Sequence, residues 1–452
     1  MDIKTQKFMV LGASKSGLAT AEYILSNGGA CAVYEELKSK KIEQSLALLK
    51  GLGATIIALD EVEDWLRKTD VLVLSPGVPI NHSIAVKAKA LGVRIIGELE
   101  FGFSQFNPIN IAITGTNGKT TTATLLDCIL KEASINSQLV GNVGVPVTSL
   151  VEKTDKNTIF VSEVSSFQLE SVNAFCPHIA CVLNISPDHL ERHYSMENYI
   201  FLKKRIFKNQ RESEYTVLNF DDQTVKEFTS ETRGKVVWVS VNGNVDGAYR
   251  ENGKLYYKGE YVIDQRELKL YGEHNVYNTL FAIACAKIMN VNTQTIATAL
   301  KTFKGVKHRM ELVAEIDGVK YYNDSKATNT ASTIVAIKTI KEPTILILGG
   351  SEKGEEYLEL FEAIKQSPVT HVVLTGASRF NMLSAAGQKG FTDITVTASF
   401  NFAVKIAKMI AKKGDCVLLS PACASFDFFN SFEERGLEFV RLVGESIEQK
   451  SD

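Results

Sequence analysis

The stretch that most constrains the fold of this chain is Ile111–Thr122, which reads Ile-Ala-Ile-Thr-Gly-Thr-Asn-Gly-Lys-Thr-Thr-Thr. An apolar run leads into it, two glycines form a turn, and Ala123–Ala133 has the pattern of a helix. A strand, a glycine turn and a helix N-terminus together form a phosphate cradle, because backbone N–H groups and the helix dipole point at the anion. The stretch therefore predicts a nucleotide-binding α/β domain.

The loop departs from the common phosphate-loop pattern in one position. That pattern has a glycine six residues before the lysine, where this chain has Ile113, so the turn is shorter. The alternative is a structural glycine turn that caps a helix, but it leaves the Gly-Lys-Thr sequence at this junction unexplained. In a phosphate loop, Lys119 would contact the terminal phosphates and Thr120 would bind Mg²⁺. We expect seven loop residues to bind ATP: Gly115, Thr116, Asn117, Gly118, Lys119, Thr120 and Thr121.

Length and composition limit the remaining possibilities. At ~150 residues per domain, the 452 residues suggest three domains. A formal net charge of −2 gives no indication of a nucleic-acid or membrane partner. The sequence has no signal-peptide pattern and no apolar run near ~18 residues, so we expect a cytoplasmic protein. Its seven cysteines form no C-x-x-C pair, which favours reduced thiols in the core.

The patterns of strands and helices predict three α/β domains. Residues 1–107 alternate strand and helix patterns, which favours a Rossmann-like parallel sheet. Residues 108–305 hold the phosphate loop. Short β segments between Val217 and Lys269, with hairpin turns at Asn242-Gly243 and Asn252-Gly253, predict a small added antiparallel sheet. Residues 306–452 alternate strands and helices again, which predicts a second Rossmann-like domain.

The first domain contains a glycine turn, Gly12–Gly17, after its first strand. The turn resembles a dinucleotide fingerprint in which Ser14 replaces the middle glycine. A nicotinamide cofactor, another nucleotide and a purely structural turn all remain open. The segment Ser75–Pro79 ends a strand at the same sheet edge, where open α/β sheets bind ligands.

Polar residues follow two strands of the middle domain. Glu163 ends a strand, where a nucleotide-bound Mg²⁺ needs a ligand, although a helix-capping glutamate is the alternative. Asp188 and His189 follow the next buried strand, and we interpret them as functional. We expect the nearby His193 to lie at the surface. Further on, the Gly272–Asn278 segment opens an apolar helix, in which Asn275 and Asn278 share a face.

Polar clusters also follow strands of the third domain, at the edge where α/β sites collect. Two of them contain Lys326 and Lys353, which suggests an acidic ligand with more than one carboxylate, although a solvated surface remains the alternative. The junction residues Gly305–Glu311 and the segment Ser420–Asp427 are further candidates.

The motifs together resemble the Mur ligase family over almost the whole chain. The resemblance rests on Thr114–Thr121, on Ser162–Glu170 and on Asp188–Leu190. The strings Asn323–Asn329 and Ser420–Gly436 are similar to the branch of the family that adds D-glutamate. What the resemblance implies is an ATP-dependent ligase of peptidoglycan precursor synthesis that joins D-glutamate to UDP-N-acetylmuramoyl-L-alanine. The reaction would pass through an acyl phosphate and a tetrahedral intermediate, and would release ADP and phosphate.

The resemblance also implies roles for the three domains. The first domain would bind the UDP-muramoyl substrate, the second would bind ATP and the third would bind the amino acid. We expect the protein to be a monomer. The resemblance implies two Mg²⁺ ions, one held by Thr120 and Glu163 and the other by His189 and a lysine carboxylated by CO₂. Lys119 would contact the phosphates. Further nucleotide contacts would be Asn275, Asn278, Arg309 and Asp324. Substrate contacts would be Ser14, Ser16, Ser75, Gly77 and Asn142 for the UDP-muramoyl substrate, and Lys326, Thr328, Lys353, Ser425 and Phe432 for D-glutamate.

The chain departs from the family after the second strand, and it offers two lysines for the modified position. The family has an arginine near the diphosphate after the second strand, where this chain has Glu35 and Glu36, with Lys38 as a weak substitute. The register of the segment 199–207 favours Lys203 over Lys204 as the carboxylated lysine, and two unmodified surface lysines are the alternative.

A folate-polyglutamate ligase and a regulatory nucleotide binder are the rival functions. The glycine turn argues against the first rival, and the metal-ligand candidates argue against the second.

Overall fold

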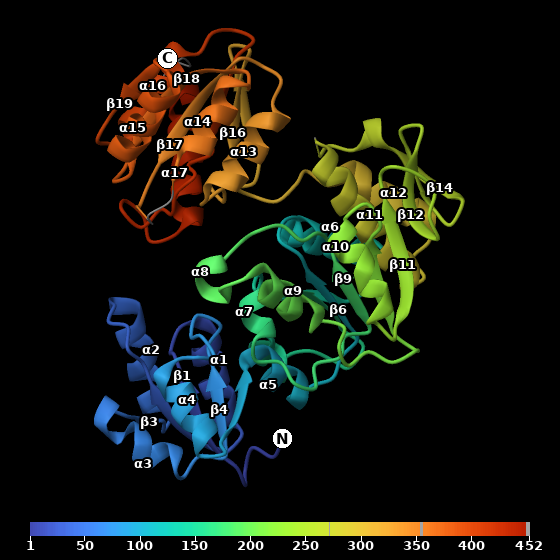
Figure 1. Cartoon of the computed structure of the whole chain (residues 1–452), viewed down its shortest axis with the longest axis vertical. Helices are drawn as coiled ribbons and strands as arrows, with labels where there is room; N and C mark the ends of the chain where they lie inside the picture. The colour runs from blue at the N-terminus through green and yellow to red at the C-terminus, as the bar shows by residue number, and fades with distance from the viewer. Residues whose placement is uncertain (271, 353–355, 449–452) are drawn as a thin grey trace. The chain divides into compact units, whose positions relative to one another are not determined.

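The structure is a computed structural model that describes residues 1–270, 272–352 and 356–448. It contains three β-sheets, each combined with helices, so the predicted three-domain α/β architecture is confirmed (Figure 1). The chain forms two compact units, Met1–Phe303 with two of the sheets and Lys304–Asp452 with the third. The boundaries that we predicted near residues 107 and 305 remain predictions.

The first sheet has five parallel strands in the order β3-β2-β1-β4-β5. Side chains alternate between its faces: Phe8 and Val10 pack into one core cluster, and Met9 and Leu11 into another. Both faces are thus buried, as expected of a parallel sheet. The strands are β1 Lys7–Leu11, β2 Ala30–Tyr34, β3 Thr55–Ile56, β4 Val71–Leu74 and β5 Arg94–Gly97. The helices are α1 Lys15–Ser26, α2 Lys40–Gly51, α3 Val62–Leu66, α4 Ser83–Ala90 and α5 Glu98–Gln105.

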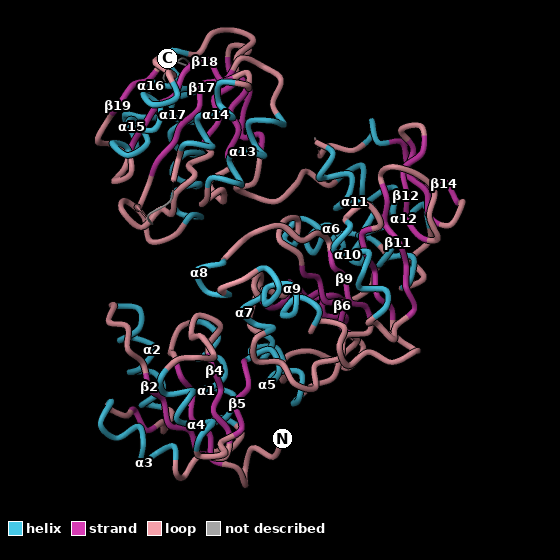
Figure 2. Tube along the Cα trace, viewed as in Figure 1, coloured by secondary structure: helices cyan, strands magenta, loops and turns pink. Residues whose placement is uncertain are grey.

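The second sheet has nine strands in the order β14-β13-β12-β11-β10-β9-β6-β8-β7. Its strands from β7 to β12 pair in parallel. Figure 2 shows the strands in magenta, with β6, β9, β11, β12 and β14 of this sheet labelled. These parallel strands are β6 Asn110–Thr114, β7 Ser137–Gly141, β8 Ile159–Glu163, β9 Ile179–Val182, β10 Tyr215–Asn219, β11 Lys235–Ser240 and β12 Gly247–Glu251. The helices are α6 Lys119–Glu132, α7 Ser166–Leu169, α8 Leu190–His193, α9 Met196–Lys204, α10 Gln223–Lys226, α11 Glu273–Ile288 and α12 Thr293–Thr302.

The predicted antiparallel element is present, and it continues this sheet. Strand β12 pairs antiparallel with β13 Lys254–Tyr257, which pairs antiparallel with β14 Glu260–Asp264. Asn252 and Gly253 form the first hairpin turn with φ of 50° and 75°, the left-handed conformations that Asn and Gly tolerate. The other Asn-Gly pair, Asn242-Gly243, lies between the parallel strands β11 and β12, so our interpretation of it as a hairpin turn was wrong.

The third sheet has the order β15-β16-β20-β17-β18-β19, with β15 antiparallel and the others parallel. Because β20 lies between β16 and β17, the carboxyl ends of these three strands meet at one edge, and their polar segments lie together there. The strands are β15 Glu311–Ile316, β16 Val319–Asn323, β17 Thr344–Gly349, β18 Val369–Thr375, β19 Ile394–Val396 and β20 Cys416–Leu419. The helices are α13 Thr330–Thr339, α14 Leu358–Lys365, α15 Arg379–Lys389, α16 Phe400–Ile410 and α17 Phe432–Glu448.

No disulfide joins the seven cysteines, all of which lie in the described residues, as predicted; five of them are buried, whereas Cys176 is exposed. Along the described ranges, we find no helix with both the length and the apolar character that a membrane span requires.

Candidate active site

The phosphate loop joins β6 to α6 at the centre of the second sheet. Gly115 has φ of 150° and Gly118 has φ of 87°, conformations that side chains disfavour. A Cβ atom on Gly118 would also lie 2.3 Å from Asn278 Oδ1. The helix begins at Lys119, four residues before the predicted start, so the Lys-Thr-Thr-Thr sequence forms its first turn. Both loop glycines are therefore required by the backbone.

Asn184, which the sequence analysis did not single out, holds the loop in shape. Its side-chain oxygen accepts from the Asn117 N–H at 2.8 Å, and its amide donates to the Asn117 carbonyl at 3.1 Å. The Thr116 N–H donates to the backbone carbonyl of Asn184. The Lys119 ammonium curls back over the loop and donates to the carbonyls of Gly115 and Thr116 at 2.8 and 2.7 Å. The loop is thus pre-formed around its lysine.

Glu163, at the end of β8, lies beside the loop strand and has one oxygen available for a cation. The strand β6 lies between β8 and β9, so the loop and Glu163 occupy the same sheet edge. One carboxylate oxygen accepts from the Asn142 amide at 2.6 Å. The other oxygen, Oε2, is buried without a hydrogen-bond partner among the described residues. A buried, unpartnered carboxylate oxygen is costly unless it binds a cation, so Glu163 fits a Mg²⁺ ligand.

No group of three or more His, Cys, Asp or Glu side chains in the described part of the chain is arranged to hold a metal ion. This fits Mg²⁺ bound to a nucleotide, because Mg²⁺ usually takes one or two carboxylates and completes its shell with phosphate oxygens and waters. Thr120, the other proposed ligand beside Glu163, is buried in the first turn of α6. Thr121 is buried next to it.

Helix α11 contributes two asparagines to the region around the loop. The Asn278 amide donates to Asn275 Oδ1 at 3.1 Å, so the two share a helix face as predicted. Thr122 Oγ1 donates to Asn278 Oδ1 at 3.2 Å. Asn278 therefore connects α11 to α6 directly behind Gly118.

Lys203 and Lys204 occupy different faces of α9, as the predicted register requires. Lys203 is only 1% exposed, and its amine donates to the Gly115 carbonyl at 2.7 Å and to Thr114 Oγ1 at 3.2 Å. Burial, with the nearby Lys119 ammonium, holds the pKa of Lys203 well below its usual value, which favours the neutral amine. Lys204 pairs with Glu231 nearer the surface. The modification of Lys203 remains a prediction.

His189 precedes the one-turn helix α8 and has φ of 53°. Its side chain is 44% exposed, and its ring nitrogens lie 3.6 Å from Asp188 Oδ2 and 3.4 Å from Glu191 Oε1. Its ring packs 4.9 Å from that of Phe167. Our prediction that His193 lies at the surface was wrong, because it is 1% exposed and its Nε2 lies 2.9 Å from Ser166 Oγ. The signal in the sequence was the apolar run Tyr199–Leu202 on the following helix, which indicates that the chain around His193 packs inward.

In the first domain, the glycine turn is closely packed against the segment that follows β4. A Cβ atom on Gly17 would lie 1.8 Å from the Gly12 carbonyl oxygen, so the helix and strand approach as a nucleotide fingerprint requires. Ser75 Oγ donates to that carbonyl at 3.0 Å. Ser14 is exposed and immediately precedes α1, and Ser16 is the second residue of that helix. A Cβ atom on Gly77 would meet no atom within 4 Å.

The acidic residues after β2 have partners of their own. The Glu35 carboxylate accepts from the Ala13 N–H at 2.6 Å, inside the glycine turn. Glu36 Oε1 lies 3.3 Å from His82 Nε2. Glu35 therefore supports the glycine turn.

The second unit contains the candidates Asp324, which is buried, and Arg309, which is half-buried. Asp324 accepts from the Met310 N–H at 3.2 Å and from Ser420 Oγ at 2.8 Å. Burial raises the pKa of Asp324 to about 6, with Arg309 opposing that shift. Arg309 Nε is buried and has no hydrogen-bond partner among the described residues.

The carboxyl edge of the third sheet brings Lys326 and Phe432 together. The Lys326 ammonium lies 5.6 Å from the centre of the Phe432 ring. Thr328 is half-buried two residues after Lys326, and Ser425 is buried in the segment after β20. The buried Arg435 joins these parts: it donates to Ser325 and to the carbonyls of Cys423 and Ala424. Lys353 lies outside the described residues.

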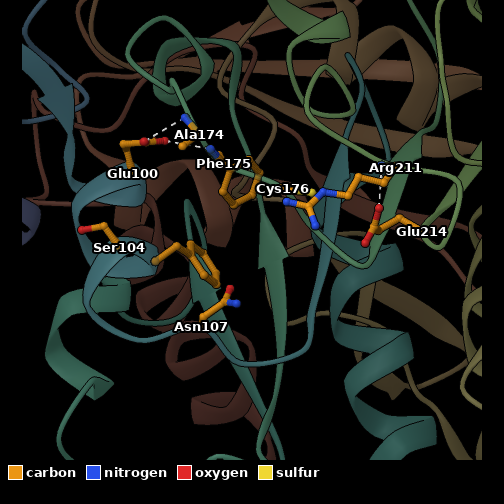
Figure 3. Close-up of a pocket in the computed structure, with 9 residues that line it drawn as sticks. Glu100, Ser104, Asn107, Ala174, Phe175, Cys176, Arg211 and Glu214 are labelled. Atoms are coloured by element: carbon orange, nitrogen blue, oxygen red, sulfur yellow. Dashed lines mark hydrogen bonds between the residues drawn. The ribbon is translucent and has the colours of Figure 1, made fainter. Parts of the chain in front are cut away.

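A pocket of about 300 Å³ lies beside the amino ends of strands β6, β9 and β10 of the second sheet, opposite the carboxyl ends that carry the phosphate loop and Glu163. Figure 3 shows the residues that line it. The Glu100 carboxylate there accepts from the N–H groups of Asn173, Ala174 and Phe175 at 2.8–3.0 Å. It thus has a structural task. None of the predicted site residues lines this pocket, which includes Phe103, Cys176 and Arg211.

Comparison with known proteins assigns the chain to a family. Residues 6–97 match the Mur ligase MurD-like N-terminal domain, residues 113–286 the Mur ligase middle domain, and residues 308–423 the Mur ligase, glutamate ligase domain. A relative from Caldanaerobacter subterraneus subsp. tengcongensis is 40% identical over 446 residues, which cover 98% of this chain and 99% of the relative. The chain belongs to the Mur ligase family.

That relative is a UDP-N-acetylmuramoylalanine–D-glutamate ligase, and so is a second from Clostridioides difficile, 40% identical over 97% of this chain and 98% of the relative. Solved Mur ligases have the same fold. The UDP-N-acetylmuramate-alanine ligase of Thermotoga maritima superposes with a TM-score of 0.62 at 18% identity, covering 98% of this chain and 100% of that one. A Thermotoga maritima MurF ligase solved with ADP has a TM-score of 0.59 at 15% identity, with full coverage of both chains.

Proposed function

We propose that this Mur ligase joins D-glutamate to UDP-N-acetylmuramoyl-L-alanine at the expense of ATP, in cytoplasmic synthesis of peptidoglycan precursors. The observation that carries the proposal is the 40% identity, over nearly the full length of both chains, to ligases of that name. The match of residues 6–97 to the MurD-like N-terminal model supports the same branch of the family.

The proposed reaction has two steps. The substrate carboxylate attacks the γ-phosphate of ATP and forms an acyl phosphate and ADP. The D-glutamate amine then attacks the acyl carbon, a tetrahedral intermediate forms, and phosphate leaves with its bonding electrons as the amide is made. No side-chain nucleophile is needed, so the protein contributes positioning and stabilisation of negative charge.

The phosphate loop would hold ATP, with the Lys119 ammonium moving from the loop carbonyls to the phosphates. Thr120 and Glu163 would hold one Mg²⁺, which neutralises charge on the phosphates when bound. The unpartnered Glu163 Oε2 supports this assignment. Asn275 and Asn278 on α11, and Arg309 and Asp324 in the second unit, would complete the nucleotide contacts. Asn142, whose amide donates a hydrogen bond to Glu163, would contact the muramoyl substrate.

A second Mg²⁺ would take His189 and a carboxylated Lys203. The burial of the Lys203 amine beneath the phosphate loop supports this proposal, because a neutral amine adds CO₂ and the product is an anionic oxygen ligand. Ser14, Ser16, Ser75 and Gly77 would bind the UDP end of the substrate. Lys326, Thr328, Ser425 and Phe432, together with Lys353, would bind D-glutamate. We further propose that the enzyme acts as a monomer, which light scattering of the purified protein can check.

The decisive test is phosphate release with UDP-N-acetylmuramoyl-L-alanine, ATP and Mg²⁺ against a panel of amino acids. We expect release with D-glutamate, and near-background rates with L-glutamate, L-alanine and diaminopimelate. Turnover with L-lysine or meso-diaminopimelate but not with D-glutamate would contradict the proposed substrate. Turnover with a folate substrate would favour the folate-polyglutamate ligase, and ATP binding without any release would favour a regulatory nucleotide binder.

A further inference from the structure

The one-turn helix α8 cannot hold its own shape, since isolated helices of four residues are unstable. It begins after His189 and ends before Tyr194, and both residues have left-handed backbones with φ of 53° and 65°. Such a turn persists when surrounding contacts determine it. We call residues 189–194 the His189 turn, whose conformation therefore depends on the side chains packed around it.

Arg192 makes the most extensive of these contacts. Its Nε donates to Glu170 Oε1 at 2.9 Å, and its Nη2 donates to Glu170 Oε2 at 2.7 Å. The two side chains are 15% and 8% exposed, so this two-bond ion pair is largely shielded from water. The guanidinium carbon lies 4.1 Å from the centre of the Phe167 ring, which packs on the His189 ring. Arg192 thus braces the residue that carries the proposed metal ligand.

The same guanidinium reaches the first domain. Arg192 Nη1 lies 3.2 Å from the Gly77 carbonyl oxygen, and Nη2 lies 3.4 Å from that of Val78. These carbonyls belong to the loop that follows β4, which we call the substrate loop, residues 75–79. The hydroxyl of its first residue, Ser75, donates a hydrogen bond to the Gly12 carbonyl of the glycine turn. The contacts join the proposed UDP-binding edge of the first sheet to the His189 turn of the second.

His193, the next residue of α8, connects the ion pair to the phosphate loop. Its Nδ1 lies 3.6 Å from Glu170 Oε1, and its ring lies 5.4 Å from that of Tyr199. The Tyr199 hydroxyl lies 3.1 Å from Thr116 Oγ1, within the phosphate loop. A continuous set of packed and hydrogen-bonded groups therefore runs from the substrate loop to the phosphate loop.

We propose that Arg192 is a positioning residue that holds the substrate loop against the His189 turn, and so sets the separation between the UDP anchor and the phosphate loop. The inference rests on the proposed function. A substrate anchored at its UDP end must present its carboxylate within ~3–3.5 Å of the γ-phosphorus, so a small shift of the anchor displaces the reacting atom. A planar guanidinium can bind a carboxylate and two carbonyls at once, whereas the point charge of a lysine cannot.

The experiment compares Arg192→Lys with the wild-type enzyme. We expect the KM for UDP-N-acetylmuramoyl-L-alanine to rise about tenfold or more and kcat to fall by about tenfold or more, because misplacement by about 1 Å can cost ~10²-fold. Calorimetry with a non-hydrolysable ATP analogue should give an affinity within about twofold of wild type, because the phosphate loop itself is unchanged. Glu170→Gln should change the same parameters in the same direction.

Glu152→Ala is the matched control. It removes another link between the first and second domains, the 2.9 Å hydrogen bond from the Asn27 amide to the exposed Glu152, and should leave both parameters at wild-type values. Wild-type parameters in Arg192→Lys would overturn the inference. So would an equal loss of analogue binding in Arg192→Lys and Glu170→Gln, which would indicate general damage. A wild-type enzyme without D-glutamate-dependent phosphate release would instead overturn the proposed function.

Discussion

The Asn142 amide donates a 2.6 Å hydrogen bond to one oxygen of Glu163 and leaves the other oxygen buried without a partner among the described residues. The bond fixes the carboxylate at the end of β8, beside the strand that leads into the phosphate loop. A carboxylate oriented in this way presents its unpartnered oxygen to a cation at no further cost in side-chain ordering. The relationship therefore supports both the metal role of Glu163 and the position of Asn142.

Glu163→Gln tests this relationship. The amide keeps the shape of the side chain but loses the charge, so we expect phosphate release to fall at least ~10²-fold and the Mg²⁺ concentration for half-maximal rate to rise. The thermal midpoint should not fall, because a buried unpartnered charge has been removed. Glu132→Gln, at an exposed position near the end of α6, is the control and should behave as wild type. A Glu163→Gln enzyme with the wild-type rate and Mg²⁺ dependence would show that the carboxylate is structural.

Gly118→Ala tests the loop backbone. The substitution places a Cβ atom 2.3 Å from Asn278 Oδ1 and forces φ of 87° on a residue that disfavours it. We expect a loss of ~1–3 kcal/mol in unfolding free energy and weaker binding of an ATP analogue. Gly243→Ala, where the added methyl group meets no atom within 4 Å, is the matched control. Equal thermal midpoints and affinities in the two variants would mean that the loop relaxes around the methyl group.

Local patterns predicted the framework of this site, because they depend on neighbours in the sequence. The apolar strand before Thr114 and the glycines of the loop determine a strand, a turn and a helix. Parallel pairing then brings Glu163 to the same edge. Contacts between distant segments were not predicted. Asn184 could have been noticed, since it interrupts the apolar run Ile179–Ile185, but its partner in the loop could not.

Arg192 and His193 were missed for a related reason. A charged residue and a histidine in a short polar segment have the composition of a surface turn, and only packing against α7 and the substrate loop buries them. The prediction of a hairpin at Asn242-Gly243 was wrong for a different reason. Its composition is that of a hairpin, but the strand that follows pairs in parallel, so the sheet as a whole overrode a local preference.

Asp324 gives the second unit a predictable pH dependence. Its pKa is raised to about 6 in the folded protein, above the ~3.9 of an unfolded aspartate. A raised carboxyl pKa stabilises the fold below the unfolded value, and this contribution is lost as pH rises from about 4 to 6. We expect the thermal midpoint of wild type relative to Asp324→Asn to decrease over that interval.

Thermal midpoints at pH 4, 5, 6 and 7 provide the measurement. Asp393→Asn, which changes an exposed aspartate of the same unit, is the control and should track wild type at every pH. A constant difference between wild type and Asp324→Asn across the interval would contradict the shift. It would mean that the Ser420 and Met310 hydrogen bonds and the Arg309 charge keep the carboxylate ionised.

The last prediction concerns the two lysines of α9, which form a natural matched pair. Lys203 is buried beneath the phosphate loop, whereas Lys204 pairs with Glu231 toward the surface. If Lys203 becomes a carbamate, Lys203→Ala removes an anionic oxygen ligand from the second Mg²⁺ and should reduce turnover by at least ~10²-fold. Lys204→Ala removes a surface ion pair worth ~0–1 kcal/mol and should keep nearly full activity.

Chemical rescue separates loss of a ligand from loss of a packed side chain. The cavity left by Lys203→Ala should admit a short carboxylate, so added acetate or formate should restore part of the activity, whereas chloride at equal ionic strength should not. Removal of dissolved CO₂ should slow the wild-type enzyme, and bicarbonate should reverse the effect. Intact-mass analysis under native conditions should detect the added CO₂. An inactive Lys204→Ala beside an active Lys203→Ala would place the modified lysine one residue later, and full activity of both variants would exclude a carbamate on α9, because the essential anionic ligand would then have to come from elsewhere.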